Sequence, residues 1–202
     1  TDNVGNRFQA HAPWSNGRLY WDYGNISDGS GRITVDYTPY LDKWTHVALV
    51  YDGDRTRSIY LDGRRVARAG GDTVGPANLS WLRLGGTGPG SNHRHRGTVD
   101  EFRIWRTART AEQIQVDMGQ TVDPAAEPDL VSYYRMDEGA GTVADDHAGA
   151  GAYLNGGVTW TTSDAPINCT PLRQLESPVL IAPAADTLLP ISPDTWFDWS
   201  DV

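Results

Sequence analysis

The sequence is poor in residues that would cross-link it or anchor it in a membrane. It contains a single cysteine, Cys169, among 202 residues, so no disulfide can form within the chain. Its formal net charge is -9 and no basic stripe runs through it, which gives no electrostatic support for nucleic-acid binding. No apolar run approaches the roughly 20 residues that a membrane-spanning helix needs. We therefore expect a soluble chain without membrane insertion.

Catalytic signatures are also missing. The motifs G-x-S-x-G and H-E-x-x-H and the phosphate-binding loop do not occur. Asp100 and Glu101 are adjacent, so on a strand they point to opposite faces and cannot flank one glycosidic bond as an acid and nucleophile pair. The sequence therefore predicts a chain that is not an enzyme and requires no cofactor.

Aromatic residues and turn signals dominate what is present. The chain has 8 Trp, 9 Tyr and 22 Gly, and Asn16-Gly17 is among the strongest hairpin signals in any sequence. Residues 44–51 are apolar on both faces, so we expect this strand to be deeply buried. The expected strands are 7–14, 18–23, 32–37, 44–51, 57–61, 65–68, 81–84, 100–105, 130–137 and 158–161.

One short helix is expected beside these strands. Thr110 is followed three residues later by Gln113, which is the spacing of a capping box, and the helix should end at Met118 before a glycine. In the preceding strand Asp100 shares a face with Phe102 and Ile104. A carboxylate on an apolar face must be hydrogen-bonded, paired or metal-bound, so we expect Asp100 to be buried and satisfied locally.

Several segments together resemble a known family. The order W-T-H-V-A-L-V-Y-D-G (44–53), I-Y-L-D-G-R-R-V (59–66), L-R-L-G-G (82–86), G-T-V-D-E-F-R-I-W (97–105) and T-A-E-Q-I (110–114) is similar to laminin-G-like or pentraxin-like modules of the concanavalin-A-like superfamily. The resemblance implies an all-β, antiparallel jelly-roll β-sandwich within a large secreted or cell-surface protein. Related modules begin with further strands, so it also implies missing N-terminal strands and an open sheet edge.

The resemblance and the composition divide the chain into parts. Residues 1–163 are expected to form the sandwich, and 164–178 read as a linker with prolines and no periodicity. Residues 179–182 and 196–200 resemble the opening strands of an immunoglobulin-like or fibronectin-like domain. We therefore expect 179–202 to begin a second, truncated β-sandwich.

Metal binding is considered because pentraxin-like relatives bind calcium through an acidic loop before the strand that matches 99–105. Here the corresponding loop, 85–97, contains no Asp or Glu, so we expect no calcium in it. Asp100, Asp145 or Asp146 could instead hold a structural calcium, with plain hydrogen bonding as the alternative. His93 and His95 could bind zinc with His46 or His11, or could simply be solvated.

A ligand site is suggested by aromatic side chains near a polar loop. Sugar rings need apolar platforms beside hydrogen-bonding groups, and core packing is the alternative role for alternating aromatic residues in a sandwich. The candidate ligand-binding residues are Trp14, Tyr20, Trp21 and Tyr23 of the first hairpin and Asn92, His93, Arg94 and Arg96 of the loop.

These patterns favour a non-catalytic extracellular module for recognition or adhesion that binds a glycan or a protein surface. One alternative is a structural spacer or assembly unit whose open sheet edge pairs with a neighbouring copy. Another is an accessory domain of a secreted polysaccharide-degrading enzyme.

Overall fold

The computed structural model describes residues 7–27, 29–70, 82–86, 94–154 and 157–167. The chain divides into two units, Thr1–Cys169 and Thr170–Val202, and every described residue belongs to the first. The expected immunoglobulin-like segment, 179–202, and most of the expected linker lie outside the described residues. Those domain boundaries stay predictions.

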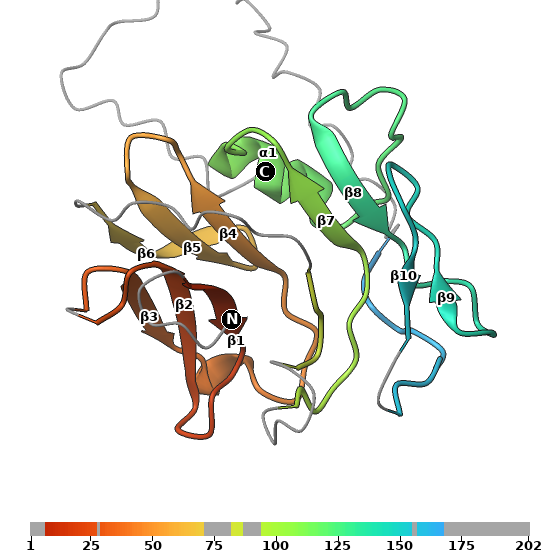
Figure 1. Cartoon of the computed structure of the whole chain (residues 1–202), viewed down its shortest axis with the longest axis horizontal. Coiled ribbons are helices and arrows are strands. Elements are labelled where there is room, and N and C mark those ends of the chain that lie inside the picture. Colours follow the sequence, from red (N-terminus) through yellow and green to blue (C-terminus); the bar gives the residue numbers. More distant parts are fainter. Residues whose placement is uncertain (1–6, 28, 71–81, 87–93, 155–156, 168–202) are drawn as a thin grey trace, which may run out of the picture. The chain divides into compact units, whose positions relative to one another are not determined.

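Two antiparallel three-stranded sheets form the centre of the first unit (Figure 1). The first has the order β1 (Arg7–His11), β2 (Arg18–Gly24) and β3 (Arg32–Asp36). The second has the order β4 (Val47–Tyr51), β5 (Arg57–Leu61) and β6 (Arg64–Ala69), and the short 3-10 helix η1 (Thr38–Tyr40) precedes it. The hairpin turn between β1 and β2 contains Asn16-Gly17, as predicted, with Gly17 at φ 76° and its N–H bonded to the Trp14 carbonyl.

Apolar side chains from both sheets meet in one core. Leu19 and Trp21 from β2 and Ile33 from β3 are buried against Ile59 and Leu61 from β5, and Tyr37 completes the cluster. Burying such side chains contributes on the order of 2 kcal/mol each. The prediction of an all-β sandwich with one short helix is confirmed.

The deeply buried strand is β5 and not β4. Every residue of β5 is buried, whereas every residue of β4 is half-buried. The reason is the sheet order, because β5 pairs with a strand on each side and β4 pairs with β5 alone in the part of the sheet that the structure describes. The prediction that 44–51 forms the deeply buried strand is therefore wrong.

The remaining elements are β7 (Phe102–Trp105), α1 (Ala111–Asp117), β8 (Leu130–Tyr134), β9 (Val143–Ala144) and β10 (Ala152–Tyr153). β7 pairs with β8, and β9 with β10. The described residues 82–84 and the segment 158–161 are not strands, contrary to prediction. Apolar residues in both segments had suggested strands, but Leu82 and Val158 are exposed and the segments join no ladder among the described residues.

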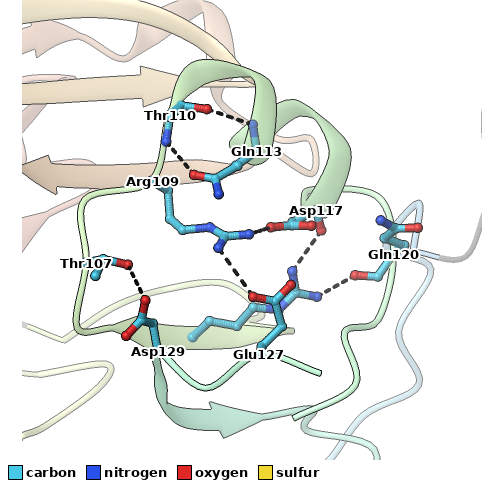
Figure 2. Close-up of polar contacts among 9 residues, drawn as sticks. Thr107, Arg109, Thr110, Gln113, Asp117, Gln120, Glu127 and Asp129 are labelled. Atoms are coloured by element: carbon cyan, nitrogen blue, oxygen red, sulfur yellow. Dashed lines mark hydrogen bonds and ion pairs between the residues drawn. The ribbon is translucent and has the colours of Figure 1, made fainter. Parts of the chain in front are cut away.

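Two arginines connect α1 to β7 and to the segment that leads into β8. The guanidinium of Arg109 lies 3.9 Å from the centre of the Trp105 ring and bonds to both Asp117 and Glu127 (Figure 2). Arg103 donates to the backbone carbonyl of Asp117 at 2.7 Å, which satisfies one of the free carbonyls at the C-terminal end of the helix. A helix of seven residues is too short to persist alone, so these contacts fix it in place.

The N-terminus of α1 supplies the first test. Thr110 accepts a hydrogen bond from the Gln113 N–H at 3.2 Å, and the Gln113 side chain accepts one from the Thr110 N–H at 2.9 Å. Thr110→Ala should lower the free energy of unfolding by about 1 kcal/mol because the Gln113 N–H at the helix start loses its hydroxyl acceptor. Urea denaturation will measure the change. Thr110→Ser keeps the hydroxyl and should be close to wild type, and equal losses in both variants would contradict the capping role.

A half-buried histidine should make stability depend on pH. His46 precedes β4, and burial, followed by the nearby charge of Arg103, lowers its pKa despite the opposing charges of Asp62 and Asp117. The folded state therefore binds a proton less readily than the unfolded chain. The free energy of unfolding should therefore not be reduced by this group above a pH of about 6.5, and it should fall as the pH drops below that value.

Thermal unfolding between neutral and mildly acidic pH will test this dependence. His46→Gln should flatten the decline, whereas His147→Gln at an exposed position should leave it in place. An unchanged pH profile in His46→Gln would show that another group is responsible.

Candidate functional site

The pairing of β2 with β1 and β3 sorts the first-hairpin side chains onto two faces. Tyr20 lies opposite His11 on β1 and Thr34 on β3, whereas Trp21 lies opposite Ala10 and Ile33. Successive residues of a strand point to opposite sides, so neighbouring aromatic residues have different surroundings. The candidate residues Tyr20 and Trp21 therefore do not share a surface.

Two of the four aromatic candidates belong to the core side. Trp21 is 2% exposed and is part of the central cluster. Tyr23 packs against the same cluster and stacks on Tyr51 with ring centres 4.6 Å apart and planes 22° apart. These two side chains stabilise the sandwich, and Trp21 presents no face to a ligand.

The other two candidates, Trp14 and Tyr20, line a pocket of about 240 Å³ together with His11 and Arg32. The rings of His11 and Trp14 meet edge to face with centres 4.6 Å apart. The guanidinium of Arg32 lies 5.0 Å from the centre of the Tyr20 ring, within the range of a cation-π contact. The side-chain amide of Asn16 donates to the Tyr20 hydroxyl at 2.8 Å and holds that ring from the turn.

Arg32 is oriented by a buried carboxylate. Asp22, which is 0% exposed and opposite Arg32 in the register, accepts bonds from Nε at 2.6 Å and from Nη2 at 2.7 Å. Such a two-point pair fixes the plane of the guanidinium as well as its position. The hydrogen bonds to Asp22 raise the pKa of Arg32, against the opposing effect of burial. Arg32 is 39% exposed, so the pair joins a buried anchor to an accessible cation.

Sequence reasoning missed His11, Asp22 and Arg32 as members of this site. Their signal was present in the strand register, because His11 pairs with Tyr20 and Asp22 with Arg32. To use that signal, the alignment of all three strands must be known. The hairpin turn fixes only the alignment of β1 with β2.

The loop candidates are not joined to the pocket in the described structure. Asn92 and His93 lie outside the described residues. Arg94 and Arg96 are exposed, and Arg94 pairs with Gly86 in an isolated bridge. Neither arginine is among the residues that line the pocket. Their part in ligand binding stays a prediction.

Asp100 differs from its expected setting. The backbone at Glu101 is left-handed, with φ 51°, so β7 starts only at Phe102 and the alternation does not extend back to Asp100. Asp100 is half-buried rather than buried. Its carboxylate accepts the Glu101 N–H at 2.9 Å and the hydroxyl of Ser163, so its local hydrogen bonding is as expected.

The other two metal candidates have unlike surroundings. Asp145 is exposed, while Asp146 accepts the backbone N–H groups of Tyr133 at 2.8 Å and Ala148 at 2.9 Å. Burial alone would raise the pKa of Asp146, but these hydrogen bonds hold it below its usual value. Within the described part of the chain, no group of three or more His, Cys, Asp or Glu residues is placed to hold a metal ion. A structural calcium stays a prediction.

Solved structures and curated proteins resemble this chain in part. A "putative carbohydrate binding protein" from Bacteroides ovatus matches 76% of this chain and 48% of its own, with a TM-score of 0.54 and 27% identity. Pappalysin-1 is 35% identical in Mus musculus and 33% identical in Homo sapiens, over 81 residues in each case. That alignment covers 38% of this chain and 5% of each pappalysin, so the chain spans a small fraction of these relatives.

Two further findings bear on the kind of protein. Across the described ranges, no helix has the length and apolar character needed to cross a bilayer. The pattern of the Laminin_G_3 family, in the concanavalin A-like lectin/glucanases superfamily, matches residues 1–115, which is more than half of the chain. The core of the two central sheets and the helix start at Thr110 both fall within that match. This protein therefore belongs to the Laminin_G_3 family of the concanavalin A-like lectin/glucanases superfamily.

Proposed function

We propose that this chain is a non-catalytic carbohydrate-binding module of an extracellular or cell-surface protein. The observation that carries the proposal is the pocket of about 240 Å³ lined by His11, Trp14, Tyr20 and Arg32. The family and the similarity to a protein from Bacteroides ovatus described as carbohydrate binding support the same kind of ligand.

The pocket combines the two kinds of group that a sugar ring requires. Trp14 and Tyr20 supply aromatic surface for the apolar face of the ring, and His11 and Arg32 supply hydrogen-bonding groups for hydroxyls. Asp22 uses Nε and Nη2 of Arg32, which leaves Nη1 for a ligand. The volume is below the roughly 300 Å³ at which pockets for larger ligands begin, so it suits one ring of a longer chain.

The lining favours binding over hydrolysis. A glycosidase needs two carboxyl groups on either side of the scissile bond. The described lining contains none, and the nearest carboxylate along the strands, Asp22, is buried beneath Arg32 and bonded to it. A sugar in this pocket would be held without an acid or nucleophile to cleave it.

Replacing Trp14 tests the pocket directly. Trp14→Ala should weaken binding of a glycan found on an array of immobilised oligosaccharides by about fivefold or more, since stacking of about 1 kcal/mol or more is lost. Titration calorimetry will measure the affinity. Tyr153→Ala is the matched control, because Tyr153 is 78% exposed and lies outside the pocket. Equal affinities for both variants and the wild type would overturn the assignment of this pocket.

The pair of Asp22 and Arg32 should also matter for stability. Arg32→Ala removes two charge-assisted hydrogen bonds from a buried carboxylate, so the free energy of unfolding should fall by about 1–3 kcal/mol, towards the lower end because Arg32 is partly exposed. The double variant Asp22→Asn/Arg32→Ala removes both charges and should recover part of that loss. Urea denaturation of the single and double variants will compare them. The pairing would be contradicted if the loss of unfolding free energy in the double variant equalled or exceeded the summed losses of its two single variants.

A further inference from the structure

A second cavity, of about 480 Å³, lies at the end of the β7–β8 pair where β7 begins and β8 ends. Three separate segments wall it: the residue before the Glu101 kink, the segment that follows β8, and the segment 160–163. None of its lining residues belongs to the first pocket. The lining side chains on which the following argument rests are Asp100, Asp137, Trp160, Thr161, Thr162 and Ser163.

The walls of this cavity are held by specific hydrogen bonds. The indole N–H of Trp160 donates to the Gly141 carbonyl at 3.0 Å, which fixes the ring as one wall. The hydroxyl of Ser163 donates to Oδ2 of Asp100, and the Glu101 N–H donates to Oδ1 of the same carboxylate at 2.9 Å. Asp100 therefore ties the segment 160–163 to the start of β7. The cavity is built by contacts between distant parts of the sequence.

The chemistry of the lining selects against negative charge. Among the described lining residues there is no Lys, Arg or His, and two carboxylates, Asp100 and Asp137, are present. Arg135 pairs with Asp137 at 2.9 Å from outside the lining, while no ion pair involves Asp100 among those found in the described residues. Carboxylates and the hydroxyls of Thr161 and Thr162 accept hydrogen bonds from ligand hydroxyls. An anionic group would meet repulsion from these carboxylates without a compensating positive charge in the described lining.

We propose that this cavity is a second carbohydrate-binding site and that it takes an uncharged sugar, stacked on Trp160 and hydrogen-bonded to Asp100 and the neighbouring threonines. An aromatic wall beside acceptors and hydroxyls is the combination that a neutral pyranose fits. The first pocket differs, because its described lining contains Arg32 and His11 and no carboxylate. The second site does not depend on the first one binding sugar.

Fluorine NMR can observe the two sites separately. The 202-residue chain is labelled with 5-fluorotryptophan, and the signals of Trp14 and Trp160 are assigned by their loss in Trp14→Phe and Trp160→Phe. The probes are uncharged pentasaccharides of glucose, xylose, mannose and galactose, and a galacturonate pentasaccharide. At least one uncharged probe should shift the Trp160 signal, with saturation below about 10 mM, and the galacturonate should not.

The variant Asp100→Asn sharpens the test. It keeps the shape of the side chain and an acceptor for the Glu101 N–H but removes the charge, so the neutral probe should bind about tenfold more weakly. Thermal unfolding of Asp100→Asn will show whether the fold is retained. In a separate experiment, a shift of the Trp160 signal in a folded Trp14→Ala protein would support independent sites.

The outcomes separate the two proposals. The second site is overturned if the Trp160 signal stays fixed with every uncharged probe. It is also overturned if galacturonate, or N-acetyl-lysine methyl ester as a cationic control, shifts this signal as much as or more than the uncharged probes do. A fixed Trp14 signal would instead count against the first pocket and would leave the result at Trp160 standing.

Discussion

The antiparallel pairing of β2 with a strand on each side is the constraint on which the rest of this structure depends. It sends Leu19 and Trp21 into the space between the sheets and Tyr20 and Asp22 to the opposite face. Because a one-residue shift would exchange the two sets, the same register that builds the core also builds the pocket of His11, Trp14, Tyr20 and Arg32. A shift in this register would therefore disrupt the core and the candidate site together.

Buried charge is used as a structural element in several places. Arg57 is only 1% exposed on the same face of β5 as Ile59 and Leu61, and its guanidinium donates to the Ser30 carbonyl. Burial lowers the pKa of Arg57, against the nearby hydroxyls of Tyr51 and Tyr23. Burying a guanidinium with few partners is costly, so this position needs the surrounding sandwich to hold it. The pairs at Arg32 and Arg109 follow a less costly pattern, in which each cation has its own carboxylate.

Local patterns in the sequence predicted much of the fold. The capping box of Thr110 and Gln113, the turn at Asn16-Gly17 and strand 57–61 depend on residues close together in the chain, and all are present. Sheet order was not available from such patterns, so the buried strand was assigned to 44–51 instead of β5. The left-handed backbone at Glu101 was equally invisible, because non-glycine residues rarely adopt it and nothing in the sequence marks it.

The candidate site was only half predicted for a similar reason. A cluster of aromatic residues in the sequence does not say which of them face the core, and Trp21 and Tyr23 turned out to pack there while Trp14 and Tyr20 did not. Recovering His11 and Arg32 requires knowing which residues lie opposite each other on three strands. Periodicity gives the alternation within one strand, and only the register between strands gives the set of side chains that meet.

The two cavities differ in how they depend on the fold. The first is formed by β1, β2, β3 and the turn between the first two, where the bonded residues Asp22 and Arg32 are 10 apart in sequence. The second needs the bond between Asp100 and Ser163, which are 63 apart. Contacts between distant segments lose more chain entropy on forming, and segments with few buried apolar side chains open at lower cost than a core sheet does. The second cavity should therefore be lost first when the protein is partly destabilised, while the pocket on β2 persists as long as the core does.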